Sequence, residues 1–114
     1  YLLNEPNALC YQVVTAEGEM TGFVCVLIGV DGEAHVTTIG VAPEHRRRGV
    51  AAKLLTQLET SLRAKQIATI VLEVRVGNVA AQELYKRCGF SITQRIARYY
   101  NNGEDGFLMM RSLI

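Results

Sequence analysis

The sequence has almost no net charge. Its 12 lysines and arginines nearly balance 11 aspartates and glutamates, which leaves a formal charge of +1. Proteins that bind nucleic acid through a broad basic face are far more positive, so no nucleic-acid partner is expected. Hydrophobic residues make up 49% and charged residues 20%, a globular rather than a disordered composition. The 114 residues suit one domain, residues 1–114, around one core.

Long apolar runs are also missing. The longest, Phe23 to Val30, is too short to span a bilayer, so no membrane association is expected. The first ten residues, YLLNEPNALC, lack the basic and apolar regions of a secretory signal, and we expect a cytoplasmic location. They also lack an initiator methionine, so we expect the chain to be truncated at its N-terminus.

Cysteine and histidine are scarce. The three cysteines, Cys10, Cys25 and Cys88, show no short pairing or metal-like spacing, which predicts three reduced thiols, each buried or half-buried. The two histidines, His35 and His45, are far apart and belong to no ligand motif. No metal site is therefore expected.

Three short strands are predicted in the first half of the chain. They are rich in β-branched and apolar residues and cover residues 10–16, 21–30 and 34–42. Asp31-Gly32-Glu33 is a strong hairpin signal between the last two. The pattern predicts an antiparallel meander that Pro43 ends, followed by the loop EHRRRG.

The periodicity becomes helical after Gly49. Apolar residues recur on one helical face from 49 to about 65, at Ala51, Leu54, Leu55, Leu58 and Leu62. Residues 68–76, ATIVLEVRV, are apolar on both faces apart from Glu73 and Arg75, which is typical of a central parallel strand. We expect strand, helix and strand to form a right-handed βαβ unit.

A second helix is marked at both ends. Asn78 suits the N-cap position, and Gly89 suits the position just after the last turn. Residues 90–100 and 106–113 then predict a long hairpin across the turn at 101–103. The predicted fold class is α+β, with a mixed sheet, a parallel strand pair at its centre, and two helices.

Positive charge is concentrated just before the first helix. Arg46, Arg47 and Arg48 precede Gly49, and a helix N-terminus offers unpaired N–H groups and the positive end of the helix dipole. Gly49 and the small Ala51 leave room for an anion at the backbone. The arrangement favours a pyrophosphate cradle, although a solvated basic loop is the alternative. It matches neither a Walker A loop nor a G-x-G-x-x-G fingerprint.

Three stretches in order resemble the GNAT family of acetyl-CoA-dependent N-acetyltransferases: GVAPEHRRRGVAAKLL, LEVRVGNVAAQELYKRCGF and RYYNNGEDGFLMM. Within that family they are most similar to the ribosomal-protein-alanine N-acetyltransferases, which modify protein α-amines. The resemblance covers about residues 10 to 114. It implies a GNAT-like mixed sheet with a splayed central parallel strand pair and helices on both faces. The family's first strand and first two helices, which form one wall of the acceptor site, have no room in this chain.

The resemblance also implies acetyl-CoA as the acetyl donor, without a metal. Its pantetheine arm would enter between the third strand and the LEV strand and pair with the backbone of Ile39, Gly40 and Val41. A glycine at position 40 suits the close approach of another chain. The pyrophosphate would bind the N–H groups of the next helix start, and an arginine side chain would reach the 3′-phosphate. Those N–H groups belong to Arg47, Arg48, Gly49, Val50, Ala51 and Ala52.

Asn78 and Tyr85 are seven residues apart and therefore share one helical face. The resemblance places that face along the cofactor, with Asn78 on the pantetheine arm and Tyr85 near the thioester sulfur. A plain N-cap and a core aromatic residue are the alternatives.

Glu73 interrupts an otherwise apolar strand, and burying a carboxylate without a partner is costly. It is the candidate general base, because an amine must lose its proton before it attacks a thioester. An ion pair with Arg75 is the alternative. Tyr99 and Tyr100 either hold the acceptor peptide, as the resemblance implies, or pack across the strands.

The sequence thus predicts an N-acetyltransferase that acts by direct transfer in a ternary complex, with a protein N-terminal α-amine as the acceptor. Cys88 adjoins a helix-capping glycine, which favours packing over a covalent acetyl-cysteine route. A small-molecule amine is the alternative acceptor; a short acidic pocket would favour it, whereas an open groove beside the two tyrosines would favour a peptide. A non-catalytic acetyl-CoA-binding regulatory module is the alternative of another class.

Overall fold

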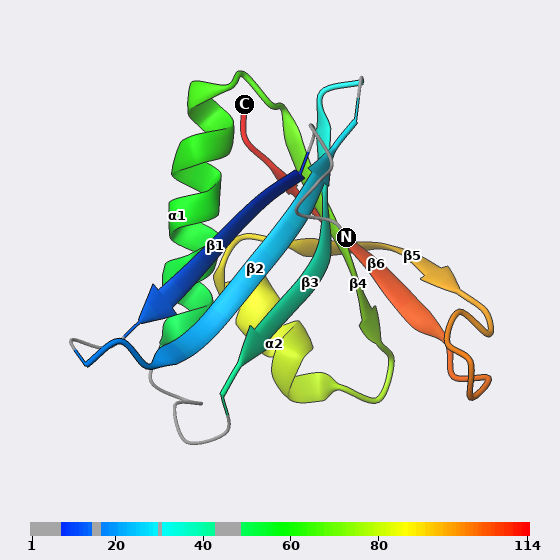
Figure 1. Cartoon of the computed structure of the whole chain (residues 1–114). Helices are drawn as coiled ribbons and strands as arrows, with labels where there is room; N and C mark the ends of the chain where they lie inside the picture. The colour runs from blue at the N-terminus through cyan, green and yellow to red at the C-terminus, as the bar shows by residue number, and fades with distance from the viewer. Residues whose placement is uncertain (1–7, 15–16, 30, 43–48) are drawn as a thin grey trace.

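One mixed sheet forms the frame of the molecule. The computed structural model describes residues 8–14, 17–29, 31–42 and 49–114. Within them lie six strands and two helices in the order β1 (Ala8–Val14), β2 (Met20–Ile28), β3 (Glu33–Val41), α1 (Val50–Ala64), β4 (Thr69–Arg75), α2 (Val79–Arg87), β5 (Ser91–Ile96) and β6 (Gly106–Ser112). The strand order across the sheet is β1-β2-β3-β4-β6-β5 (Figure 1).

The predicted meander is confirmed, since β1, β2 and β3 pair in antiparallel fashion. Gly32 forms the turn between β2 and β3 with a φ of 79°, a left-handed conformation that favours glycine. Pairing of β2 with β3 continues to the end of β3, with one irregularity beside Cys25. The predicted loop after Pro43 lies outside the described residues.

The predicted parallel pair is confirmed and is short. β3 and β4 pair at three positions only, Glu33 with Thr69, Ala34 with Ile70, and His35 with Val71. Beyond His35 no pairing joins the two strands, and Figure 1 shows them diverging toward the end where α1 begins. The central pair is therefore splayed, as the resemblance implied.

Each helix has the predicted apolar stripe or cap. Leu54, Leu55, Leu58 and Leu62 of α1 are buried. The side chain of Asn78 caps α2 by accepting a hydrogen bond from the Ala81 N–H at 3.1 Å. Gly89 follows α2 with a φ of 94°, as a helix-ending glycine should. Within the part of the chain that the structure describes, neither helix is long and apolar enough to cross a membrane.

The two helices of the described residues lie on the same face of the sheet. Leu58 of α1 and Tyr85 of α2 share one hydrophobic cluster with Leu72 and Val74 of β4, and Figure 1 shows both helices behind the strands. The reason is topological. The connections from β3 to β4 and from β4 to β5 both join parallel strands and both progress in one direction across the sheet. Two right-handed crossovers of that kind place their helices on one side.

The expectation of three reduced thiols is wrong for two of the cysteines. Cys10 and Cys25 form a disulfide between β1 and β2, with 4.2 Å between their Cα atoms. They are direct cross-strand partners, because the hairpin register places them opposite each other. Their spacing in the sequence, 15 residues, gives no hint of this. Cys88 is free and half-buried beside the end of α2.

The last two strands form the predicted hairpin with a longer connection. β5 ends at Ile96, so Tyr99 and Tyr100 lie in the loop rather than in a strand. Asp105 holds this loop by accepting hydrogen bonds from the Arg98 N–H at 2.9 Å and from Arg95 Nε at 2.8 Å.

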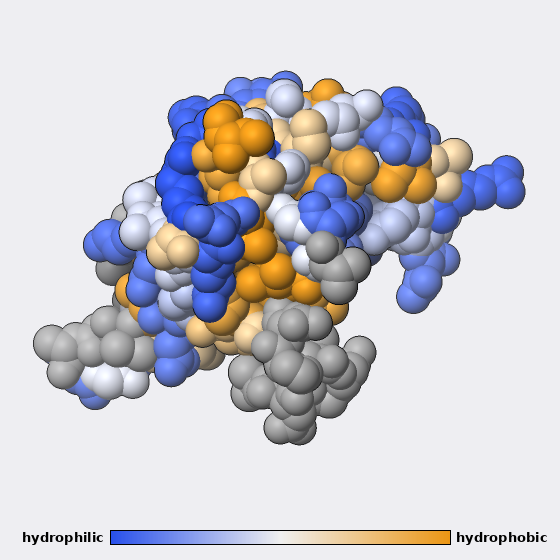
Figure 2. Space-filling view, turned by 90° about the horizontal axis from the view of Figure 1, so that it is seen from above, coloured by the Kyte–Doolittle hydropathy of each residue, from blue (hydrophilic) through white to orange (hydrophobic). Residues whose placement is uncertain are grey.

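At the other end of the sheet, Figure 2 shows a band of hydrophobic side chains between hydrophilic ones, and the C-terminal Ile114 is exposed.

The core between α1 and the sheet should dominate stability. Leu58 is fully buried, so Leu58→Ala should lower the free energy of unfolding by about 2–5 kcal/mol, because it removes apolar contacts and leaves a cavity. Gln57→Ala, on the exposed side of the same turn, should change it by less than about 0.5 kcal/mol. Urea denaturation of both variants measures the difference. Equal effects would contradict the predicted packing of α1.

Candidate functional site

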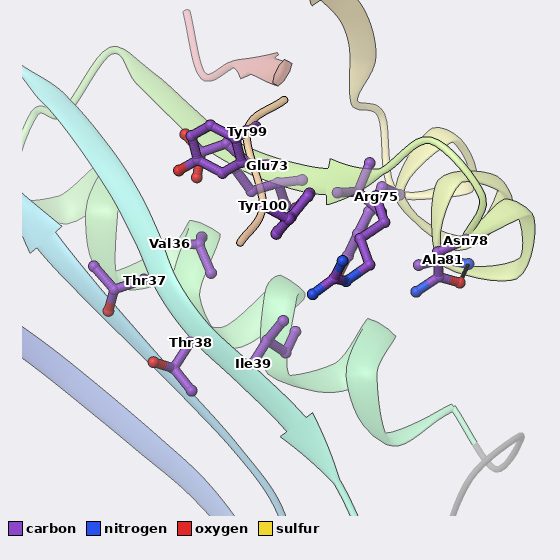
Figure 3. A pocket seen from close by; sticks show the side chains of 13 residues that line it. Val36, Thr37, Thr38, Ile39, Glu73, Arg75, Asn78, Ala81, Tyr99 and Tyr100 are labelled. Carbon is purple, nitrogen blue, oxygen red and sulfur yellow. Dashed lines mark hydrogen bonds between the residues drawn. The ribbon is translucent and has the colours of Figure 1, made fainter. Parts of the chain in front are cut away.

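The divergence of β3 and β4 opens a cavity of about 410 Å³. Its walls come from four parts of the chain that are distant in sequence: the second half of β3, the second half of β4, the start of α2, and the loop between β5 and β6. The lining residues are Val36, Thr37, Thr38, Ile39, Leu72, Glu73, Val74, Arg75, Asn78, Ala81, Tyr85, Tyr99 and Tyr100. Figure 3 shows Glu73, Tyr99 and Tyr100 grouped on the β4 side, across from Val36 and Ile39 of β3.

Glu73 supplies the acidic side chain among the described residues that line this cavity. Its carboxylate is 2.7 Å from Nε2 of His35 on β3, and the Tyr99 phenol, whose pKa burial raises, lies close enough for the charge of Glu73 to raise that pKa further. Only 16% of the side chain is exposed. A carboxylate held in one orientation at the edge of an apolar strand and facing a cavity is a suitable group for a general base.

The alternative interpretation of Glu73 as the ion-pair partner of Arg75 is wrong. Arg75 pairs instead with Glu104 at 3.1 Å, and its guanidinium lies 4.1 Å from the centre of the Tyr100 ring. Glu104 also accepts a hydrogen bond from the Gly77 N–H at 2.9 Å. The hydrogen bond from the Gly77 N–H holds the pKa of Glu104 below its usual value, and the hydrogen bond from Arg75 makes the next largest contribution. These contacts fasten the loop between β5 and β6 to the end of β4.

Tyr99 and Tyr100 form the aromatic side of the cavity. Their rings meet edge to face with 4.9 Å between centroids. Burial raises the pKa of both phenols, and the charge of Glu73 adds to the rise at Tyr99. Both hydroxyls therefore stay protonated at neutral pH and can donate hydrogen bonds. Tyr99 is still 44% exposed. Tyr99 and Tyr100 lie in a loop and pack over Gly106 at the start of β6, so the packing alternative holds in part.

Tyr85 and Asn78 face the cavity from one side of α2, as their spacing predicted. Tyr85 is buried, packs against Phe90 at 6.0 Å between ring centroids, and belongs to the core cluster. Burial raises the pKa of its phenol, with smaller contributions from Tyr100 and Cys88. The oxygen of Asn78 caps the helix, which leaves the amide N–H groups as the donors available to a ligand. Tyr85 is thus a core residue and Asn78 is an N-cap, as the two alternatives predicted, and both residues also line the cavity.

The predicted anion cradle lies partly outside the described residues, because Arg46, Arg47 and Arg48 are not among them. What the structure describes is the helix start itself. Gly49 has a φ of 76° and open space where a Cβ would stand. α1 begins with Val50, Ala51 and Ala52, and no acidic residue lies in its first turn. The N–H groups of a first turn have no partner within their own helix and so point toward any anion placed there.

The predicted pantetheine contacts on β3 divide into two groups. Ile39 lines the cavity, whereas Gly40 and Val41 are described through their pairing with Phe23 and Gly22 of β2. A Cβ at position 40 would come within 2.9 Å of the Phe23 ring, so a larger residue there would require that ring to move. Within the described part of the chain, no group of three or more His, Cys, Asp or Glu side chains could hold a metal ion.

Sequence reasoning missed His35. It was set aside because it belongs to no ligand motif, yet it contacts the candidate base from the neighbouring strand. The signal that could have identified it is the register of the parallel pair, which places His35 opposite Val71, on the same face as Glu73 two residues further along β4.

Comparison with known proteins fits this geometry. The acetyltransferase (GNAT) family matches residues 1–90. The catalytic subunit of the N-terminal acetyltransferase B complex of Arabidopsis thaliana is 35% identical over 118 residues, which cover 99% of this chain and 67% of that protein. This chain spans about half to two thirds of the length of the Arabidopsis protein and of two other curated relatives.

Solved structures show the same fold. The crystal structure of the ribosomal-protein-S18-alanine N-acetyltransferase from Escherichia coli superposes with a TM-score of 0.88 at 31% identity. The match covers 96% of this chain and 72% of the Escherichia coli chain. A Bacillus anthracis structure described as a streptothricin acetyltransferase in complex with acetyl coenzyme A has a TM-score of 0.85 at 26% identity. The match covers 96% of this chain and 64% of that chain. The chain belongs to the GNAT family of acetyl-CoA-dependent N-acetyltransferases.

Proposed function

We propose that this enzyme transfers the acetyl group of acetyl-CoA to the α-amine at the N-terminus of a protein. The observation that carries the proposal is the charge of the cavity, where Glu73 supplies one carboxylate beside the cation of Arg75. A polyamine carries several cations and requires several carboxylates, whereas a peptide N-terminus carries one amine next to a neutral backbone. The names of the relatives in Arabidopsis and in Escherichia coli, which describe N-terminal and ribosomal-protein-alanine acetylation, support the same acceptor class.

The described residues fit acetyl-CoA. A backbone strand that has lost its neighbour offers unpaired N–H and C=O groups, and β3 offers them at Ile39 along the cavity. Gly49 leaves open space beside the first turn of α1, where N–H groups suit a pyrophosphate. Asn78 adds amide donors between these two regions. Bound in this way, acetyl-CoA supplies the activated acetyl group at the mouth of the cavity.

The acceptor nitrogen loses two protons on the way to an amide. Glu73 removes the first from the ammonium, which frees the lone pair that forms the N–C bond to the acetyl carbon; the second leaves the nitrogen as the tetrahedral intermediate collapses and balances the proton that the departing sulfur takes up. When the C–S bond breaks, the electron pair stays on sulfur, and the Tyr85 hydroxyl donates a proton or hydrogen bond to the departing thiolate. Tyr99 and Tyr100 hold the acceptor backbone with their hydroxyl groups, and their grouping with Glu73 supports this role.

The acceptor class and the base can be tested together. Purified enzyme should acetylate short peptides with free α-amines in preference to spermidine and other small amines, as measured by mass spectrometry and initial rates. Glu73→Gln keeps the shape of the side chain and removes the proton acceptor, so kcat should fall by about 10²–10⁴-fold. Acetyl-CoA binding should stay unchanged in calorimetry. Preference for a polyamine would overturn the acceptor class, and tight acetyl-CoA binding without any turnover would indicate a non-catalytic module.

Tyr85→Phe should lower kcat by about 10²-fold while acetyl-CoA binding and thermal stability stay nearly unchanged. The pKa of Tyr85 is raised from the ordinary 10.0, so the phenol keeps its proton throughout the range from pH 6 to 9.5. The loss of rate should therefore be the same across that range. A wild-type kcat that declines between pH 8 and 9, with the decline abolished in Tyr85→Phe, would show that the Tyr85 phenol loses its proton in that range and would contradict the raised pKa. Preserved turnover with lower stability would leave Tyr85 as a core residue.

Gly49→Val should weaken acetyl-CoA binding at least about tenfold, because a branched side chain fills the space beside the helix start. The positive φ adds backbone strain, which must be separated from the loss of space. Gly32→Val is the matched control, since Gly32 has a φ of 79°, open space around it, and a position in the turn between β2 and β3. Calorimetry should show weakened binding for Gly49→Val alone. Equal affinities for both variants would exclude the cradle.

A further inference from the structure

We propose that His35 is a positioning residue that holds the carboxylate of Glu73 in place for the acceptor amine. The inference deepens the proposed function, since it assigns a partner to the proposed base. His35 belongs to β3 and Glu73 to β4, and their side chains meet at 2.7 Å between Nε2 and Oε1. The bond therefore joins the two strands whose separation forms the active-site cavity.

The location of this bond gives it a specific task. Backbone pairing between β3 and β4 ends at His35 and Val71. Glu73 lies two residues beyond Val71 and points to the same face, where the backbones have already diverged. The imidazole spans this widening gap, so its hydrogen bond joins the two strands where their backbone pairing has ended. It fixes the side chain of Glu73 at the narrow end of the opening.

His35 acts through Glu73 rather than on the substrate. Glu73 lines the cavity and His35 does not. The imidazole is 42% exposed on the open face of the sheet, while Glu73 is only 16% exposed. A glutamate side chain has three rotatable bonds, and the hydrogen bond with His35 restricts them. Restricting a base in this way helps catalysis, because small displacements from the reactive geometry are costly in rate.

The chemistry of the pair fixes the tautomer of the imidazole. A carboxylate can only accept a hydrogen bond, so a neutral His35 must carry its proton on Nε2. This leaves Nδ1 as the unprotonated nitrogen. The arrangement follows the logic of carboxylate–histidine pairs in other enzymes, where one partner sets the orientation of the other. Here the cavity receives the carboxylate, and the imidazole is the supporting group.

A pair of substitutions separates positioning from simple packing. His35→Phe keeps a ring of similar size without a donor, and His35→Gln offers an amide N–H near the position of Nε2. For His35→Phe, kcat should fall about 10- to 100-fold, with the KM for acetyl-CoA unchanged. His35→Gln should retain kcat within about threefold of the wild type. Equal kcat values for wild type and His35→Phe, or equal losses in both variants, would overturn the proposal.

A double-mutant cycle tests the route through Glu73. In the Glu73→Gln background, His35→Phe should have almost no further effect on kcat, because the group that it positions is already gone. A full additional loss would show that His35 acts elsewhere. The cycle can be run with whichever amine the enzyme accepts best, so failure of the proposed peptide acceptor would not be mistaken for failure of this inference.

A spectroscopic measurement keeps the proposal testable even if a variant fails to fold or no acceptor is found. Nitrogen-15 NMR of the imidazoles in the wild-type protein near pH 8 should show His35 with its proton on Nε2, and the assignment follows from comparison with His35→Gln. In Glu73→Gln this preference should weaken, since an amide can present either its oxygen or its nitrogen to the ring. A proton on Nδ1 in the wild type would overturn the proposed pair.

Discussion

The short parallel ladder between β3 and β4 is the constraint on which the rest of the site depends. It stops after three residue pairs, although each strand continues. Each strand is held open by its other neighbour, because β3 stays paired with β2 up to Val41 and β4 stays paired with β6 up to Arg75. The gap therefore cannot close by a simple sideways shift of one strand. Every group assigned to the site reaches its position from the edges of this gap.

Features specified by neighbouring residues could be predicted from the sequence. The leucine stripe of α1, the Asn78 cap and the hairpin turn at Gly32 are local, and each was found where its pattern placed it. Features that depend on strand register could not be predicted in this way. The Cys10–Cys25 disulfide and the His35–Glu73 contact both join residues that are distant in sequence and meet only because of pairing between strands.

The placement of the helices shows an intermediate case. The apolar character of residues 68–76 on both faces predicted a central parallel strand, and β4 is that strand. The side on which the helices pack follows from the order of the strands, since two right-handed crossovers that progress in one direction place α1 and α2 together. That order follows from the pairing of β6 between β4 and β5, which no local pattern in the sequence reveals.

The distribution of charge explains why Glu73 suits the role of a base. Glu59, Glu104 and Asp105 each pair with arginine, and their pKa values are lowered. At Glu59 burial opposes this shift, and hydrogen bonds from two arginines outweigh it. Such carboxylates are held in the ionised form and accept protons poorly. Glu73 has an imidazole and a phenol as partners instead. An imidazole and a phenol orient a carboxylate without the permanent positive charge of a guanidinium, so the side chain of Glu73 is fixed in position without an arginine partner.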